Sequence, residues 1–514
     1  MNRSITIARP LAALTLIVLA GAPAFAQCEE PKWVQMNVPG PSARTAHAMA
    51  WDDASQRVIL FGGQDLNGNA LNDTWAWNGQ RWTQLNPTGQ QPPARRNHAM
   101  GTWTGRAAMF GGTPNGSTAL SDLWIFSNGS WVQIVTTGAP PTGRYFHNMT
   151  SLGSGNSSQI VMMGGSNSNC SQVFDAFRLT AAGQWIPFTP PSNLARRTFM
   201  GLVNIEGIGN NDFGILQGNI TPCSTATPGN TIWHNAQTDA YNVVQGNPPQ
   251  PARWNFAHGS SWNDPNTPRK GYVQFGGDRG PAFNLLGDTW HTRETTPGAF
   301  NTFSVSGPAP SARRNNNGMA WDMARDHYVM FGGNNTQNAA LGDTWVLTFK
   351  PIFTTLPQSR NLCNGSTAVF TAAADGPGTI TYQWFLNGQQ LFNGNQSIGG
   401  FILGATGSAM TYVGTQSGFS GILTCVATNS CGSTSTQSVP VASSPCTLPC
   451  GPIDFNGNTV YPEDADVIDF FTVLAGGDCT TGNCYSIDFN GNNVFPEDAD
   501  VIAFFRVLAG GSCN

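Results

Sequence analysis

Two short stretches near the C-terminal end carry oxygen-bearing side chains at the alternating spacing of a cation-binding loop. "DFNGNTVYPEDAD" begins at Asp454, and "DFNGNNVFPEDAD" begins at Asp488. Calcium loops use this spacing to place carboxylate, amide and backbone oxygens around one ion, at loop positions 1, 3, 5 and 7. The candidate ligands at these positions are Asp454, Asn456, Asn458 and Val460 in the first copy and Asp488, Asn490, Asn492 and Val494 in the second.

A calcium loop also needs a carboxylate that closes it. Position 12 counted from Asp454 is Ala465, so the loop either contains one extra residue and closes with Asp466, or uses Asp464. We take Asp466, with Asp500 as its counterpart in the second copy. Position 6 lacks the usual glycine in both copies. The alternative is an Asn-rich turn that binds nothing, but the duplication of every ligand type favours two calcium ions in the tail.

Each loop is followed by a short segment with helical features. In "PEDADVIDFFTVL" the proline suits the first helical position, acids favour the amino-terminal end, and apolar residues recur at helical spacing. A loop plus one helix, present twice and bracketed by cysteines, resembles the dockerin module of exported bacterial proteins. The resemblance implies a cohesin-like or cell-envelope partner. The docking candidates, which alternatively pack the two helices together, are Phe470, Phe471, Phe504 and Phe505.

The sequence before this tail predicts short strands joined by tight turns. The chain has 514 residues, with 60 Gly, 34 Pro and only 10% charged residues, a composition typical of mainly β proteins. Apolar runs ending in a glycine pair recur at "ILFGG", "AMFGG", "VMMGG", "VQFGG" and "VMFGG", with a weaker copy at "GILQG". An aromatic signature such as "DTW" or "DLW" follows each run.

This pattern resembles the kelch repeat, in which four strands form one propeller blade. The resemblance implies a six-bladed β-propeller over residues 27–350. "KWVQMNV", which begins at Lys32, is similar to an outer strand but precedes the first complete unit. We therefore expect the N-terminal strand to complete the last blade and close the ring. We expect no cofactor in the propeller.

One arginine stands at the same place in all six units, just before the innermost strand, and His47, His98 and His147 follow it in the first three. Facing a channel mouth, these guanidinium groups would suit a carboxylate or sulfate ligand. In the alternative, each arginine binds carbonyls of its own blade or a nearby aspartate. The arginines are Arg44, Arg95, Arg144, Arg196, Arg253 and Arg313.

Residues 351–445 have alternating strands, with "ITYQWFLNG" and "LTCVATN" resembling two strands of a bacterial immunoglobulin-like β-sandwich. Cys363 lies before the strand that normally carries the partner of Cys425. We therefore favour a Cys363–Cys431 disulfide and a buried free thiol at Cys425 over a Cys363–Cys425 bridge.

Eleven cysteines in an exported chain mostly form pairs, and at least one is left over. Cys170 and Cys223 follow the glycine pairs of adjacent units at equal spacing, which favours a bridge between blades. In the tail, equal spacings predict the pairs Cys450–Cys479 and Cys484–Cys513, one for each copy. Cys28 and Cys446 have no assigned partner.

Residues 1–26 have the basic start, apolar stretch and "AFA" ending of a signal peptide, which predicts a secreted or cell-surface protein. No later apolar run is long enough to span a membrane. The signal peptide carries two arginines, so its removal takes the net charge from −5 to −7. Residues 446–514 contain ten acids and one base, a net of −9. The remainder is near +2, which argues against a nucleic-acid ligand.

These features predict a mainly β chain of three parts: a six-bladed kelch-like propeller, an immunoglobulin-like β-sandwich and a small α-helical calcium-loop tail (residues 446–514). We expect a non-enzymatic binding protein whose propeller recognises an extracellular glycan or protein. An acidic glycan would suit the arginine ring. None of the common hydrolase, metalloprotease or phosphate-loop motifs occurs. The alternative is a carbohydrate-active enzyme (oxidase, lyase or hydrolase) delivered by the dockerin-like tail.

Overall fold

The computed structural model describes residues 30–509, with internal gaps. The gaps are residues 154, 169–170, 174, 190–197, 205–212, 218–230, 236–239, 245–250, 252, 262–270, 280–283, 297–298, 306, 315–317, 364–366, 397–399, 414–419, 445–452, 459, 461–462, 481–483, 490–493 and 495–496. The site candidates that lie outside the described residues are Cys28, Cys170, Arg196, Cys223, Cys446, Cys450, Asn490, Asn492 and Cys513.

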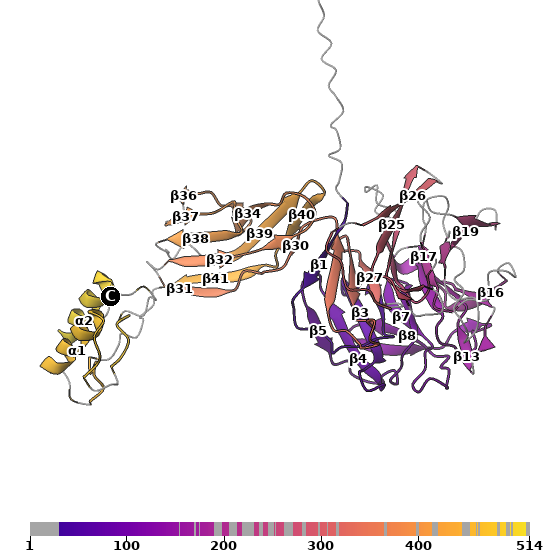
Figure 1. The fold of residues 1–514 in the computed structure, drawn as a ribbon, viewed down its shortest axis with the longest axis horizontal. Coiled ribbons are helices and arrows are strands. Elements are labelled where there is room, and N and C mark those ends of the chain that lie inside the picture. Colours follow the sequence, from indigo (N-terminus) through magenta and orange to yellow (C-terminus); the bar gives the residue numbers. More distant parts are fainter. Residues whose placement is uncertain are drawn as a thin grey trace, which may run out of the picture.

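The fold is mainly β, as the sequence predicts, and it has three parts (Figure 1). Six sheets of four or five strands, with two small two-stranded sheets, form the first part, which we call the sheet ring (residues 32–349). Two larger sheets and one two-stranded sheet form the second region (residues 352–444), and two short helices form the tail (residues 453–509). No helix in the described part of the chain is long and apolar enough to cross a membrane.

The first three ring sheets follow one another along the chain, and each is a meander of four strands. The third sheet also gains the short parallel strand β10 (Thr137–Gly138). The first sheet comprises β2 (Ala48–Asp52), β3 (Arg57–Gln64), β4 (Ala70–Trp77) and β5 (Trp82–Leu85); the second comprises β6 (Ala99–Trp103), β7 (Arg106–Phe110), β8 (Leu123–Ser127) and β9 (Ser130–Ile134); the third comprises β11 (Asn148–Leu152), β12 (Gln159–Met163), β15 (Ala176–Leu179) and β16 (Gln184–Phe188).

The last three ring sheets repeat this order, except that the sixth takes its outer strand from the N-terminal end of the chain. The fourth comprises β17 (Gly201–Asn204), β18 (Phe213–Leu216), β19 (Thr231–Asn235) and β20 (Ala240–Val244); the fifth comprises β21 (Ala257–Ser261), β22 (Gly271–Phe275), β25 (Thr289–Thr296) and β26 (Ala299–Ser304); the sixth comprises β27 (Met319–Asp322), β28 (His327–Phe331), β29 (Thr344–Thr348) and β1 (Lys32–Met36).

The six sheets close into a ring through their innermost strands. Each of these strands contacts the innermost strands of the sheets before and after it, and β27 contacts β2. The outer strand β1 pairs antiparallel with β29, with Gln35 opposite Trp345. The N-terminal strand thus completes the sixth sheet, as the "KWVQM" pattern indicates.

The glycine pairs are required where one sheet meets the next. Gly62 and Gly63 have φ angles of 58° and 103°, which other residues rarely adopt. A side chain on Gly62 would lie 2.7 Å from the backbone oxygen of Arg95, which belongs to the following sheet. Only glycine therefore allows adjacent sheets to approach this closely.

Outer-strand tryptophans fasten the first, second and sixth sheets to the sheet that precedes each of them. Trp131 of the second sheet donates its indole N–H to Thr74 of the first sheet at 2.9 Å. Trp82 of the first sheet bonds in the same way to Thr344 of the sixth. The threonine is the middle residue of the "DTW" signature, so its hydroxyl recurs at each seam where that signature occurs.

The second region packs two sheets around one apolar core, which includes the fully buried Trp384 and Cys425. Cys425 is a free thiol, as expected, and burial raises its pKa to about 12. Cys431 is disulfide-bonded, and the side chain of Cys363 is outside the described set. One sheet contains β31 (Arg360–Cys363), β41 (Val439–Ser444), β39 (Gly421–Asn429), β34 (Thr381–Leu386), β35 (Gln389–Gln390) and β40 (Gly432–Ser435); the other contains β32 (Ala368–Thr371), β38 (Ala409–Val413), β37 (Phe401–Leu403) and β36 (Gly394–Asn395).

The second region is held against the sheet ring by polar contacts. The side-chain amide of Asn429 donates to the backbone oxygen of Phe349 at 2.9 Å, and Lys350 lies 3.2 Å from Asp326. The strand β30 (Ile352–Phe353) pairs with β33 (Ala374–Asp375), and Ile352 contributes to a core of the ring. These contacts surround the point where the chain leaves the ring.

The tail consists of α1 (Asp464–Leu474) and α2 (Asp498–Leu508), which pack against each other. The rings of Phe470 and Phe504 are fully buried and stack at 4.2 Å. The predicted cysteine pairs in the tail are wrong, because Cys479 bonds to Cys484. The intervening turn brings their Cα atoms to 5.6 Å, within the range of a disulfide.

Candidate functional site

The repeated arginines are structural groups rather than a ligand-facing ring. The five in the described part of the chain are buried, with exposures of 0 or 1%. In the second sheet, Arg95 donates from both terminal nitrogens to Asp122, at 2.7 and 2.6 Å, and from one of them to the Gly111 carbonyl. The same carboxylate accepts the indole N–H of Trp124. The corresponding pairs are Arg44–Asp73, Arg144–Asp175, Arg253–Asp288 and Arg313–Asp343.

These arginines also join neighbouring sheets through their backbones, and we call the whole arrangement the arginine clamp. Arg95 receives a hydrogen bond from Gly63 of the first sheet at its oxygen, and donates its N–H to Leu71. Arg44 makes the equivalent backbone bonds with Gly333 and Leu341 of the sixth sheet. The prediction of a ligand-binding guanidinium ring is therefore wrong for the five described arginines, because carbonyls and aspartates occupy their donors.

The clamps make the stability of the ring sensitive to acid. Burial alone would raise the pKa of the aspartates, but the hydrogen bonds and charge of the partner arginine outweigh it. The pKa is therefore held below the ordinary 3.8 at four clamps. A lowered folded-state pKa stabilises the fold above the unfolded value and loses that contribution as the pH falls. We expect the unfolding free energy of the ring to drop as the pH falls past 3.8.

Asp278 provides a control of opposite sign. Burial raises its pKa to about 6, although Arg314 lies 3.5 Å away. This group stabilises the fold as the pH falls from about 6 to 3.8, since the folded state then binds the proton more readily. Denaturant unfolding across pH 7 to 3 measures both effects. Asp278→Asn should abolish the gain above pH 4 and leave the loss below it. In the Asp278→Asn variant, where that gain is absent, equal stability at pH 3 and pH 6 would contradict the clamp interpretation.

The histidines that follow the clamps lie in the cores between sheets. Burial, together with the charge of Arg44, lowers the pKa of His47 to about 3. His147 has a pKa of about 3 for the same reasons, with Arg144 as the neighbouring charge. His47 packs edge-on against Phe331 of the preceding sheet. These neutral rings therefore serve as packing groups at the seams.

The innermost strands enclose an axial cavity of about 110 Å³, lined in two layers. Alternate residues of a strand face the same side, so residues two apart on each strand contribute to different layers of one wall. The first layer is mainly apolar and comprises Met49, Met100, Met149, Leu202, His258 and Met319. The second is mixed aromatic and polar and comprises Trp51, Thr102, Ser151, Asn204, Ser260 and Trp321.

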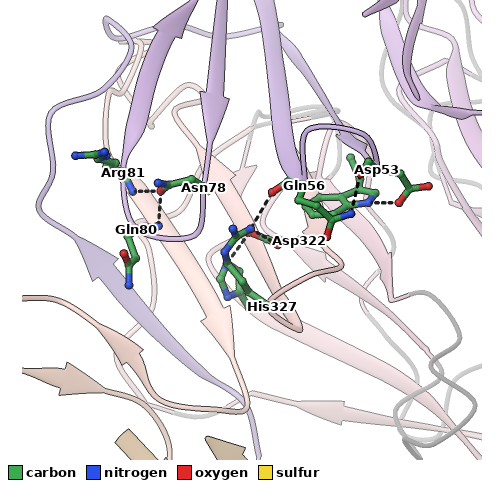
Figure 2. A network of polar contacts seen from close by, with 9 residues as sticks. Asp53, Gln56, Asn78, Gln80, Arg81, Asp322 and His327 are labelled. Atoms are coloured by element: carbon green, nitrogen blue, oxygen red, sulfur yellow. Dashed lines mark hydrogen bonds and ion pairs between the residues drawn. The ribbon is translucent and has the colours of Figure 1, made fainter. Parts of the chain in front are cut away.

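The turns between the first and second strands of the sheets form one end of this cavity. Asp53 lies there, half-buried, and accepts the Trp51 indole N–H at 2.6 Å (Figure 2). The same figure shows the seam between the sixth and first sheets, where His327 lies 3.5 Å from Asp322. Arg325 bonds to both Asp322 and the backbone oxygen of Gln56, so it bridges that seam.

One side chain of the cavity wall has a buried acceptor atom without a hydrogen-bond partner. It is Asn204, through Oδ1, and the residue is 6% exposed. Burial lowers the pKa of His258 to about 4, so its imidazole is neutral. The kelch resemblance implies a channel, but the residues of its wall could not be named in advance, because the register that places methionine and asparagine there emerges only when the strands are paired.

The first duplicated loop brings its predicted ligands together. The Asn458 N–H donates to Asp454 Oδ1 at 3.0 Å and to Asn456 Oδ1 at 3.1 Å. Asp466 is fully buried, and its Oδ1 accepts the Asn456 N–H at 3.4 Å, whereas Asp464 is exposed. This favours Asp466 as the closing carboxylate. A set of hard oxygen donors around a buried carboxylate fits calcium.

The structure adds one acid that the sequence reasoning missed. Glu463 precedes α1, and its Oε1 lies 3.4 Å from the side-chain nitrogen of Asn456 and also contacts that of Asn458. The signal was present, since "PED" occurs in both copies. In the second copy, Asp500 is also buried and accepts the backbone N–H of Glu497, which matches the bond from Glu463 to Asp466.

The helix pair leaves part of its apolar surface exposed. Phe471 and Phe505 are 40 and 44% exposed, and their rings lie 5.8 Å apart. Ile468 and Ile502 are also more than half exposed. A shallow pocket beside Phe471 is lined by Val467, Ile468, Thr472, Ala475 and Gly477. Of the four predicted docking phenylalanines, two therefore form the core and two remain at the surface.

Solved structures give distant matches that cover different shares of the chain. "Structure of YjhT" is 13% identical, with 60% of this chain and 96% of that chain covered and a TM-score of 0.42. "Crystal structure of titin M3 domain" is 25% identical, with 18% of this chain and 96% of that chain covered and a TM-score of 0.16. No curated protein matches the chain.

A family model matches the N-terminal part of the chain. The model is the KLHDC2/KLHL20/DRC7 Kelch-repeats domain, and it matches residues 24–198. This range includes the first three ring sheets, with their glycine pairs, clamps and aromatic signatures. The chain therefore contains a kelch-repeat domain.

Proposed function

We propose that the chain is an exported, non-enzymatic binding protein. Its sheet ring is a six-bladed kelch-type propeller that recognises an extracellular glycan or protein. Its second region is an immunoglobulin-like spacer, and its tail is a dockerin-like module that attaches the protein to a cohesin-like or cell-envelope partner. Kelch-repeat domains generally bind partners, which supports the recognition role.

The single observation that carries the attachment role is that, in each pair of adjacent phenylalanines, one ring is buried in the core and the other is exposed. Phe470 and Phe504 supply the core of the tail, so its fold does not require the exposed Phe471 and Phe505. Exposed apolar groups that are clustered on one surface are typical of interaction sites. Each of the duplicated helices contributes one exposed phenylalanine to this cluster, as in a docking module.

The axial cavity favours binding over catalysis. Among the described residues that line it, Asp53 alone carries a carboxylate, and that group already accepts the Trp51 indole. Glycoside hydrolysis generally needs two carboxylates across the scissile bond. Of the enzyme alternatives delivered by the tail, a hydrolase that acts in this cavity is therefore the weaker hypothesis, and an oxidase or lyase stays an alternative.

The attachment role requires that calcium stabilise the tail. We expect calcium to raise the unfolding free energy of the tail in the full mature chain by about 1–3 kcal/mol at concentrations well above its dissociation constant. The ion would be held by loop oxygens in which Asp454 and Asp488 supply the first carboxylates. Calorimetric unfolding with calcium and with chelator measures the shift.

A matched pair of double variants separates ion binding from helix stability. Asp454→Ala with Asp488→Ala should abolish the calcium shift. Asp464→Ala with Asp498→Ala removes two exposed acids at the helix starts and should preserve it. If neither calcium nor chelator changed the unfolding temperature of the tail, the proposed calcium-dependent attachment would be wrong.

A further inference from the structure

We infer that the axial cavity binds one neutral hexose unit, with its hydroxyl groups at the polar layer around Asn204 and its C–H face against the methionines and tryptophans. This inference rests on the proposed recognition role of the propeller and names the ligand class. It replaces the acidic ligand that the arginine ring would have favoured.

The charge of the cavity excludes strongly charged ligands. No lysine or arginine is among the described residues that line it, so an anion finds no opposite charge. Its histidine, His258, is neutral because burial lowers its pKa to about 4. The carboxylate of Asp53 is the only formal charge among these lining residues, and the Trp51 indole bonds to it.

The two layers match the two chemical sides of a sugar ring. Four methionines and a leucine give one layer an apolar surface, which suits C–H groups. Trp51 and Trp321 stand on neighbouring innermost strands at the second layer, and Trp321 is half-buried. Serine and threonine hydroxyls of that layer both donate and accept hydrogen bonds, as sugar hydroxyls require.

The unpartnered side-chain oxygen of Asn204 points to a missing polar ligand. Buried polar side-chain atoms are nearly always hydrogen-bonded, so an exception on a cavity wall needs an explanation. A ligand hydroxyl that donates to Asn204 Oδ1 would supply the missing bond. At about 30 Å³ for each water, the volume of about 110 Å³ holds roughly four waters, so the cavity encloses part of a hexose ring and the rest of the sugar lies at its open end.

Titration of the full mature chain with single sugars tests the inference. The probes are D-glucose, D-galactose and D-mannose, with D-glucuronate and D-glucosamine as charged analogues of the same ring. Calorimetry and intrinsic tryptophan fluorescence should show one neutral hexose binding in a 1:1 ratio, with the charged analogues at least tenfold weaker. The methyl glycoside of the binding hexose shows whether the site takes the end of a glycan or the free sugar only.

Two variants identify the site. Asn204→Val should weaken hexose binding at least tenfold while the thermal midpoint stays equal or rises, because it removes an unsatisfied buried acceptor. Trp321→Ala should also weaken binding, and Leu66→Ala, at an exposed position remote from the cavity lining, should not. Failure of all three hexoses at high millimolar concentration, or normal binding by both cavity variants, would overturn the inference.

The result for hexose binding in the cavity can be distinguished from the result for the proposed function. If no hexose binds but the calcium shift of the tail persists and the propeller captures a protein or a charged glycan, the ligand class is wrong and the binding function stands. If the calcium shift is absent but a hexose binds in the cavity, the attachment role fails and the cavity assignment stands.

Discussion

Replacing Asp122 by alanine is expected to lower the unfolding free energy of the sheet ring by about 3–5 kcal/mol, the usual cost of leaving one partner of a buried ion pair uncompensated. Arg95 has no exposed surface, and it would lose an acceptor from each terminal nitrogen. Trp124 would lose its acceptor as well. Denaturant unfolding of the full chain, followed by tryptophan fluorescence, measures the loss.

Two controls test whether burial is the cause. Asp375→Ala breaks an ion pair with Lys32 at side-chain exposures of 44 and 34%, and should cost only about 0–1 kcal/mol. The double variant Arg95→Met, Asp122→Leu replaces both charges with apolar groups and should recover part of the loss, since no unpaired charge remains. Equal effects of Asp122→Ala and Asp375→Ala would refute the clamp as a stabilising unit.

Phe470→Ala is the second large effect, because it opens a cavity in a very small core. Phe470 is fully buried and stacks on Phe504, and truncation of a buried phenylalanine typically costs about 3–5 kcal/mol. We expect the tail to unfold at a much lower temperature while the sheet ring remains folded. Calorimetry of the full chain separates the two transitions.

The neighbouring residue provides the matched comparison. Phe471→Ala removes the same ring from a position that is 40% exposed, and should cost far less stability. With Phe505→Ala it should instead weaken capture by a cohesin-like or envelope partner, tested by co-sedimentation with isolated cell envelopes. If Phe471→Ala destabilised the tail as much as Phe470→Ala, the exposed pair would belong to the core and the docking surface would be lost.

The strands of the ring can be predicted well from the sequence, because similar strand-ending residues recur from unit to unit. Gly62 and Gly63 mark a sheet seam that no other residue permits, and this marker recurs. The outer-strand pattern at Lys32 also predicts its place beside β29. A local motif that recurs at the same place in each repeat can be recognised from a single sequence.

The contacts across each unit were harder to predict. The arginines and the aspartates of the "DTW" signature are both visible as repeats, but their side chains meet across 27 to 35 residues of chain. The arginine backbone bonds to the preceding sheet, and its side chain bonds to the glycine carbonyl and aspartate of its own sheet. The guanidinium donors are therefore used inside the protein and do not face the channel. The sequence supplied both partners and left open whether they met.

The tail shows the opposite failure. Equal spacings between cysteines predicted one disulfide around each copy, yet the turn after α1 brings Cys479 beside Cys484. The loop spacing does report local contacts, since Asp454 and Asn456 both accept the Asn458 backbone N–H, and the calcium ligand set stays a prediction. Local spacing is informative within a turn and loses its value once tertiary contacts decide which residues meet.

If the protein is held by its tail, as we propose, the pairing of β1 with β29 has a mechanical consequence. Any pull on the tail passes through the second region and enters the ring along β29, which lies between β1 and β28 rather than at the edge of its sheet. Two ladders of hydrogen bonds are then loaded in shear, and they must break together rather than one bond at a time. Pairing with the N-terminal strand therefore allows the ring to resist force at the point where the chain leaves it.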